Sequence, residues 1–251
     1  MNNPAQQLAD VITMPVRSVG GMVGAQASSL AAEAARTARI WTANEVDDWG
    51  RDNGFVDRVW AISRLRWDVS VGGTQHIPKR AGALIVVNAR RFALAPLFAA
   101  LAIGGEVGRP VRFVGRPDIA PVGPIMQRLG GLLPIAREIE GALRAGQLVV
   151  LGAGHTITNS RTGDVDHRLV SAATVAGVRS IPAAAVSVPG RRSARVEVGA
   201  PIRLTKKRRG PLDELETADA LTIRIDELLD ELGWSPTGTP LDWLPFGLGG
   251  D

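Results

Sequence analysis

The sequence predicts an α/β domain whose mixed, mostly parallel sheet is flanked by helices, with a helical region at its N-terminus. Short apolar runs recur from residue 67 onward, as buried strands do. Segments of helical character alternate with these runs, which is the order expected of parallel strands joined by helices. With 251 residues and 45% hydrophobic content, the chain can bury the core of one large domain.

Residues 1–65 are expected to form the helical N-terminal region. Residues 26–41 are rich in alanine, the strongest helix former, and a second helix is predicted for residues 56–65. Four of the six tryptophans lie in or beside this region, namely Trp41, Trp49, Trp60 and Trp67. Packing against the main domain is the expected role of these rings, and anchoring at a membrane–water interface is the alternative.

Residues 66–233 are expected to form the main α/β domain. Trp67, Val69 and Val71 alternate as in a strand, and Gly72 and Gly73 then turn the chain. Further strands are predicted from apolar runs at residues 83–87, 111–114, 132–135, 148–151, 181–188 and 195–198.

Two helices are predicted within the main domain. One is buried and spans residues 96–103, because Pro96 starts it and Gly104 and Gly105 are expected to end it. The other is amphipathic, with apolar residues at helical spacing from Leu221 to Leu232. The tail, residues 234–251, is rich in proline, glycine and aromatic residues and is expected to lie extended along the surface.

The composition excludes several kinds of site. The chain has no cysteine, so disulfides, thiolate nucleophiles and zinc–thiolate sites are impossible. Its three histidines are far apart in sequence, and neither a metal ion nor a cofactor is expected. A net charge of only +4 gives no support to nucleic-acid binding. Basic residues concentrate in 190–210 and acidic residues in 211–231, which indicates two solvated surfaces; contact of residues 206–209 with anionic lipid headgroups is the alternative.

No segment has the length and apolar character of a membrane-spanning helix, which needs about 18 or more apolar residues. The N-terminus also lacks the basic start of a secretory signal. The expected location is therefore the cytoplasm or the inner face of the plasma membrane.

The Gly-x-Gly sequence at Gly152 and Gly154 follows a predicted strand, as in dinucleotide-binding proteins. The third glycine position holds Ile157, and no acidic residue follows about 20 positions later at a strand end. We therefore expect no nucleotide site there.

The loop after the apolar run at residues 83–87 has the layout of a reactive loop at a strand end. Asn88 ends the strand, Arg90 and Arg91 follow, and Pro96 opens the next helix. Residues 89–95 nevertheless contain no side chain suited to accept a proton or attack a carbonyl group.

Seven segments, taken in order, carry a family resemblance, namely residues 71–78, 83–96, 109–115, 129–137, 147–158, 177–182 and 196–202. Together they resemble the glycerolipid acyltransferases of the lysophosphatidic-acid (1-acylglycerol-3-phosphate) acyltransferase type. The resemblance runs from about Trp67 to Leu232 and implies an acyltransferase-like α/β fold linked to glycerophospholipid metabolism and phosphatidic acid biosynthesis.

The resemblance also implies that the catalytic groups have been lost. In that family a motif histidine, oriented by an aspartate five positions later, removes the proton of the acceptor hydroxyl, which then attacks an acyl thioester carried by coenzyme A or acyl carrier protein. Here Ala89 and Leu94 occupy these two positions, and Arg91 stands where serine is usual. In the later motif no glutamate lies between Leu151 and Thr158, and Ile157 takes the place of an arginine.

The ligand expected from the resemblance is a phosphorylated or other anionic lipid. Gly131 and Arg137 fall in the motif that binds the acceptor's phosphate in that family. Arg90 and Arg91 are further candidates, because the planar guanidinium group matches phosphate oxygens. Ion pairing or solvation at a loop end is the alternative for this pair.

Three functions follow from the sequence. The first is a catalytically inactive protein that keeps the acyltransferase fold and binds a phosphorylated lipid or a membrane partner. The second is an active acyltransferase with relocated catalytic groups, in which His155 is the candidate base. The third is a non-enzymatic adaptor for a membrane-associated protein, built on the same fold.

Overall fold

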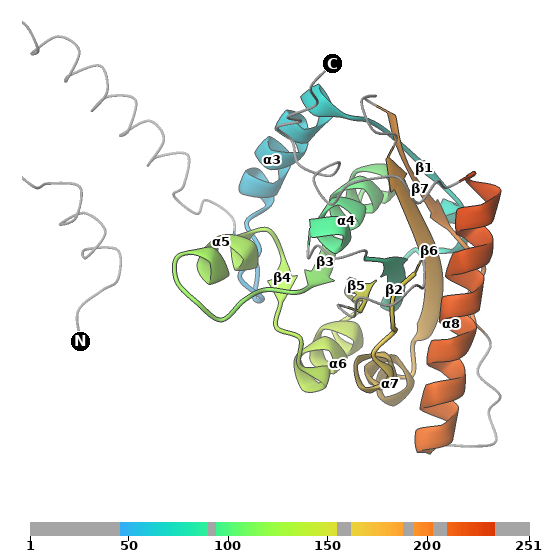
Figure 1. Cartoon of the computed structure of the whole chain (residues 1–251). Helices are drawn as coiled ribbons and strands as arrows, with labels where there is room; N and C mark the ends of the chain where they lie inside the picture. Colours follow the sequence, from blue (N-terminus) through green and yellow to red (C-terminus); the bar gives the residue numbers. More distant parts are fainter. Residues whose placement is uncertain (1–45, 90–93, 155–161, 188–192, 203–209, 234–251) are drawn as a thin grey trace, which may run out of the picture. The chain divides into compact units, whose positions relative to one another are not determined.

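The computed structural model describes residues 46–89, 94–154, 162–187, 193–202 and 210–233. These residues form a seven-stranded sheet in the order β1-β7-β6-β2-β5-β3-β4 (Figure 1). Strands β6 and β7 run antiparallel, and the other neighbouring strands run parallel. The predicted mixed, mostly parallel α/β fold is therefore confirmed. The helix predicted for residues 26–41, the tail and the basic residues 206–209 lie outside the described residues.

The strands lie close to the positions predicted from the apolar runs. Their bounds are β1 Asp68–Gly72, β2 Ala83–Asn88, β3 Val111–Val114, β4 Gly131–Leu132, β5 Leu148–Ala153, β6 Arg179–Ser187 and β7 Ser193–Val198. Every residue of β2 is buried, because helices cover both faces of the sheet. This explains why its sequence is continuously apolar instead of alternating.

The strand predicted for residues 132–135 is shorter than expected. β4 ends at Leu132, and the N–H of Ile135 donates to the carbonyl of Leu133 in a tight turn. Pro134 has no N–H to extend the ladder, and Ile135 becomes the N-cap of the next helix.

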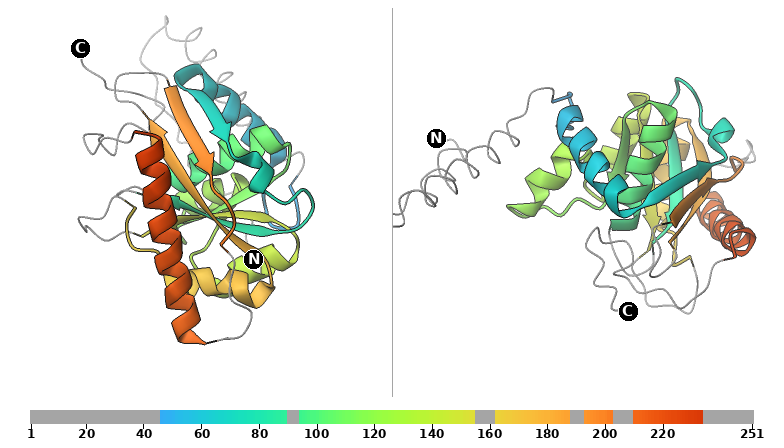
Figure 2. Two further views of the ribbon diagram at one scale, coloured as in Figure 1. Left: turned by 90° about the vertical axis from the view of Figure 1, so that its right-hand side faces the viewer. Right: turned by 90° about the horizontal axis from the view of Figure 1, so that it is seen from above.

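Helices cover the two faces of the sheet. On one face lie α3 (Asn53–Arg66) and α4 (Leu94–Val107). On the other lie α6 (Ala136–Arg144), α7 (His167–Ala176) and α8 (Pro211–Glu231), and Figure 2 shows α8 across the strands from α3. The short helix α5 (Val122–Arg128) precedes β4. No described helix is both long enough and apolar enough to cross a bilayer.

The predicted end of the buried helix at Gly104 and Gly105 is wrong, since α4 continues through both glycines to Val107. Close packing explains their presence. A Cβ on Gly105 would lie 2.8 Å from Nε1 of Trp60, and one on Gly104 would lie 3.2 Å from the carbonyl oxygen of Arg109. The glycines therefore let α3 and the start of β3 approach α4.

The tryptophans of the described residues pack against the domain, as expected. The Trp67 ring makes an edge-on contact with Phe98 of α4, with ring centroids 4.8 Å apart. Trp60 packs on the core beneath α4. The guanidinium carbon Cζ of Arg112 lies over the Trp49 ring, 5.7 Å from the ring centroid.

Two ion pairs hold the segment before α3 against β3 and α5. Asp47 contacts the fully buried Arg112 of β3, with 2.5 Å between Oδ2 and Nη2. Asp52 contacts Arg128 of α5 at 2.6 Å and also caps α3 by accepting from the N–H of Phe55. Burial alone would raise the pKa of the Asp52 carboxyl group, but the hydrogen bonds from Arg128 and Phe55 outweigh burial and lower it.

We expect Asp52→Asn to lower the free energy of unfolding by about 2 kcal/mol at neutral pH, because hydrogen bonds to a charged group are lost. The folded-state pKa of Asp52 is lowered from 3.8, so its contribution is fully present above about pH 4 and is lost as the pH falls through the folded-state value. Urea unfolding across pH should therefore show the two proteins converging in acid. Glu227→Gln, which breaks an exposed pair on α8, is the control with nearly unchanged stability. A gap that stays constant with pH would contradict the assignment.

Candidate functional site

The carboxyl ends of β2 and β5 mark a topological switch point. The two strands are adjacent and parallel. After β2 the chain continues to α4 on one face of the sheet, whereas after β5 it continues to α7 on the other face. Where adjacent parallel strands lead to helices on opposite faces, a crevice opens outside their carboxyl ends, and ligands commonly bind there.

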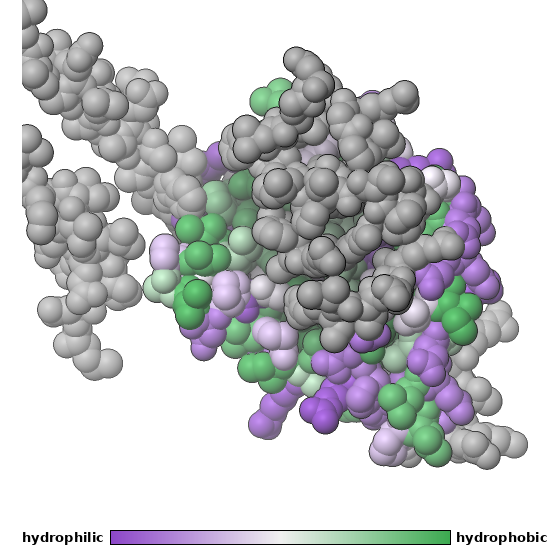
Figure 3. Space-filling model, in the orientation of Figure 1, coloured by the Kyte–Doolittle hydropathy of each residue, from purple (hydrophilic) through white to green (hydrophobic). Residues whose placement is uncertain are grey.

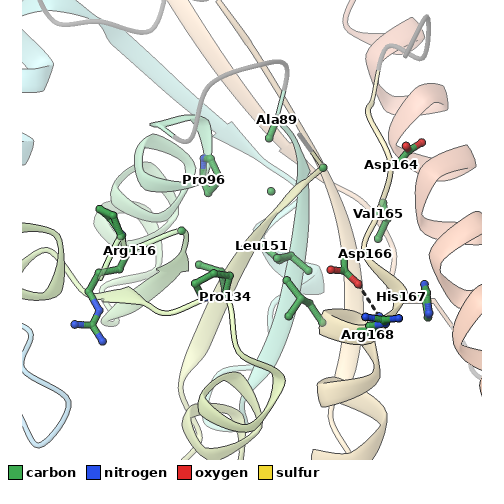
Figure 4. Close-up of a pocket in the computed structure, with 16 residues that line it drawn as sticks. Ala89, Pro96, Arg116, Pro134, Leu151, Asp164, Val165, Asp166, His167 and Arg168 are labelled. Carbon is green, nitrogen blue, oxygen red and sulfur yellow. Dashed lines mark hydrogen bonds between the residues drawn. The ribbon is translucent and has the colours of Figure 1, made fainter. Parts of the chain in front are cut away.

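A cavity of about 790 Å³ lies at this switch point. Its apolar wall comes from the ends of β2, β3 and β5, the turn after β4, the start of α4, and the segment before α7 with the first turn of that helix. The residues are Ala89, Pro96, Val114, Pro117, Pro134, Leu151, Val165 and Leu169. Charged and polar side chains of Arg116, Asp164, Asp166, His167 and Arg168 complete the lining. In Figure 4, Arg116 and the charged residues of the α7 segment lie on opposite sides of the apolar wall.

Ala89 follows the last residue of β2 and places a methyl group in the cavity wall. The residue is 6% exposed and lines the cavity. A Cβ on Gly152 would lie 2.8 Å from the Cβ of Ala89 and 2.7 Å from Cγ of Pro96. The wall between β2 and β5 is thus closed by small apolar groups in direct contact.

Asn88, the last residue of β2, has a structural role. Its side-chain amide donates to the carbonyl of Ala185 at 3.0 Å, and its side-chain oxygen accepts from the N–H of Ala185 at 2.7 Å. These bonds continue the pairing of β2 with β6 beyond the last backbone pair, Val87 with Ala183. The side chain is engaged by the backbone and fixes the point at which the chain turns into the cavity wall.

Arg116 is the half-buried cation of the cavity. It lies two residues after β3, and its Nη2 is 3.6 Å from a carboxylate oxygen of Glu138. Its Nη1 donates to the side chain of Gln127 at 3.4 Å, while its Nε is buried without a hydrogen-bond partner. The guanidinium group is thus engaged by Glu138 and Gln127, and the unpaired Nε is not exposed to the cavity.

The α7 side of the cavity is more exposed and more polar. Asp166 is the N-cap of α7, where its carboxylate accepts from the N–H of Arg168 at 2.9 Å. In Figure 4 the ring of His167 points away from Ala89. Thr162 anchors this segment, since its buried hydroxyl donates to Asp226 of α8. Among the described residues, no group of three His, Asp or Glu side chains is arranged to hold a metal ion.

Gly154 is explained by chain packing. The carbonyl oxygen of Asp164 lies so close that it would collide with any Cβ at Gly154. The glycine thus lets the returning chain pass over the end of β5. This packing explains the second glycine of the Gly-x-Gly sequence, and a bound nucleotide is not needed to explain it.

Neither of the two expected ligand residues that the structure describes lines the cavity. Arg137 is exposed on α6 and is not part of the cavity lining, and Gly131 is buried in β4, where a Cβ would lie 2.8 Å from the carbonyl of Met126. Arg90, Arg91 and His155 lie outside the described residues. Leu94 begins α4, but its side chain is likewise outside the described part.

Sequence reasoning overlooked Arg116. The available signal was its place directly after Gly115, at the carboxyl end of the run at residues 111–114. Parallel strands present their carboxyl ends at one edge of a sheet, so an arginine at that position shares an edge with Ala89.

The comparisons with known proteins support the fold. The structure is similar to the crystal structure of PlsC, the 1-acyl-sn-glycerophosphate (LPA) acyltransferase from Thermotoga maritima, with a TM-score of 0.54 and 15% sequence identity over 81% of this chain and 90% of that chain. At this identity the likeness concerns the fold. No protein-family model and no curated protein matches the sequence.

We expect Asn88→Ala to lower the free energy of unfolding by about 2–4 kcal/mol, because it leaves the buried N–H and carbonyl of Ala185 without partners. Asn88→Asp keeps the acceptor and loses the donor, so it should also destabilise. Ser171→Ala removes an exposed local hydrogen bond on α7 and is the control. Urea unfolding measures all three, and a cost for Asn88→Ala as small as the control's would contradict the structural role.

Proposed function

We propose that this protein has lost acyl transfer and binds a phosphorylated or other anionic lipid in the cavity at the switch point. The observation that carries the proposal is the methyl group of Ala89 in the cavity wall, at the position of the base in the resembled family. A hydroxyl group is a weak nucleophile at neutral pH unless a positioned base removes its proton. An alanine there leaves the reaction without its first step.

The cavity favours an amphiphilic ligand. Its volume of about 790 Å³ is within the range of small-molecule sites, roughly 300–1,000 Å³. The apolar wall around Leu151 and Pro96 suits an acyl chain, and the positive charge of Arg116, which lines the cavity, suits a phosphate or carboxylate group. An open cavity with this lining also favours a lipid-binding protein over an adaptor without a ligand.

Relocated catalysis is the second candidate, because two carboxylates of the α7 segment, Asp164 and Asp166, line the cavity. Asp166 is already engaged as the cap of α7. The base for this candidate would be His155, acting from the segment that joins Gly154 to these carboxylates.

We expect no acyl transfer above background from acyl-coenzyme A or acyl carrier protein to lysophosphatidic acid or glycerol 3-phosphate. A radiolabelled-acceptor assay with the full chain checks this expectation, with His155→Ala measured alongside. Turnover that is well above background and disappears in His155→Ala would overturn the loss of catalysis and support relocated chemistry.

We also expect a phospholipid or lysophospholipid to co-purify with the protein and to be released intact in native mass spectrometry. Binding of a short-chain lysophosphatidic acid below its micellar concentration should weaken about tenfold in Arg116→Ala, the loss of one charge-assisted contact. Arg168→Ala, on the opposite side of the cavity, and Arg137→Ala, outside its lining, are the matched controls. Equal weakening in all three variants would contradict a specific role for Arg116, and an empty protein that binds no lipid would contradict the proposed function.

A further inference from the structure

The apolar turn before α5 is exposed beside the cavity. Ile119 and Val122 are 65% and 40% exposed, and the intervening Ala120 and Pro121 are exposed as well. Figure 3 shows hydrophobic residues gathered over α5 at the left of the molecule. We call residues 119–122 the α5 tip.

The α5 tip has a defined conformation. The N–H of Gly123 donates to the carbonyl of Ile119 at 2.7 Å, which closes the turn. A Cβ on Gly123 would lie 2.6 Å from the carbonyl oxygen of Pro117, so the chain on both sides of the tip is in close contact. The apolar side chains are thus presented outward by a turn that is already ordered.

The α5 tip and a second exposed apolar residue, Ile135, each closely follow a residue that lines the cavity. Pro117 and Pro134 both line the cavity, and each is followed within two residues by an exposed isoleucine, Ile119 or Ile135, the latter 51% exposed. Apolar side chains therefore flank the cavity from two separate segments of the chain.

Both basic and acidic residues lie near these apolar residues in the sequence, and the exposed cation is Arg137. Arg137 is exposed two residues after Ile135, at the start of α6. Asp118 directly precedes the tip in the sequence, and Glu138 is engaged by Arg116 and by the N–H of Leu133. An apolar turn, together with an exposed Ile135 that an exposed arginine closely follows in the sequence, fits the boundary between acyl chains and anionic headgroups.

We propose that the α5 tip, together with Ile135 and Arg137, inserts into the surface of an anionic lipid bilayer and places the cavity against the membrane. A bilayer fits better than a protein groove, because the apolar residues form an outward turn and not a flat face. The choice of a lipid surface rests on the proposed lipid-binding function, since the same residues flank the cavity that would receive the lipid.

The absence of cysteine from the chain allows a direct test. Ile119→Cys in the full chain is labelled with a polarity-sensitive fluorophore and mixed with vesicles of phosphatidylcholine and phosphatidylglycerol, or of phosphatidylcholine alone. Leu212→Cys is the matched control, because Leu212 is 72% exposed but lies at the start of α8. We expect a blue shift of the label at position 119 on the anionic vesicles and none at position 212. No shift at position 119, or equal shifts at both positions, would overturn the proposal.

A second measurement removes the apolar groups. We expect the double variant Ile119→Ser, Val122→Ser to lower the fraction of protein that sediments with anionic vesicles about tenfold. The double variant Leu212→Ser, Leu215→Ser on α8 should not. Arg137→Ala should weaken sedimentation at low salt and have less effect at high salt. Unchanged sedimentation of the tip variant overturns the proposal. The proposal is also overturned if the unmodified protein forms a dimer or binds a protein partner and the tip variant does not.

The outcomes separate this proposal from lipid binding in the cavity. The tip variant should bind soluble short-chain lysophosphatidic acid as well as the unmodified protein does, whereas Arg116→Ala should sediment normally with vesicles. If the unmodified protein inserts at position 119 but does not bind soluble lipid, the proposed function alone is contradicted. Soluble lipid binding without insertion would contradict the membrane contact alone.

Discussion

The pair of hydrogen bonds between Asn88 and Ala185 is the constraint on which the cavity depends. Backbone pairing holds β2 to β5 as far as Ala153, but on the other side the backbone pairing with β6 stops at Val87. The Asn88 side chain supplies the next two bonds to β6. It therefore holds the last residue of the strand between two neighbours and fixes where Ala89 meets the cavity. Because an amide both donates and accepts, asparagine suits this position independently of any reaction nearby.

Much of the fold could be predicted because burial on both faces gives β2 and β5 nearly continuous apolar sequences, whereas β1 and β7 alternate between more exposed and more buried residues. The helices were harder. Gly104 and Gly105 resemble a helix end, but their lack of a side chain serves contact with Trp60 and Arg109. Helices α5, α6 and α7 were not predicted, since they are short and only parts of them are apolar. α7 did carry a local signal, the capping residue Asp166, but such signals become clear only when the packing partner is known.

The chemistry of a single residue in the site could be predicted from the sequence. Which residues lie together in the cavity was harder to predict, because that depends on how the elements pack. That Ala89 cannot act as a base follows from its residue type alone, and the structure adds that it lies in the cavity wall. Choosing between Arg116 and Arg137 required the spatial relation of β3, β4 and α6, which sequence spacing does not supply. Function is set by the groups at a site and not by the fold that carries them. Here the walls are held by core packing and backbone bonds, and none of these contacts requires a reactive side chain.

The brevity of β4 has a consequence for association with other molecules. A long open edge strand exposes unpaired N–H and carbonyl groups and invites another chain to add a strand. β4 contributes only Gly131 and Leu132 to its edge, and Pro134 follows without an N–H to donate. The β4 edge therefore offers very few backbone N–H and carbonyl groups to which another strand could pair. Amyloid-like or domain-swapped pairing is disfavoured at this edge. Contacts on the side of the molecule next to the cavity must be made by side chains, whose chemistry can be matched to a lipid surface in a way that backbone pairing cannot.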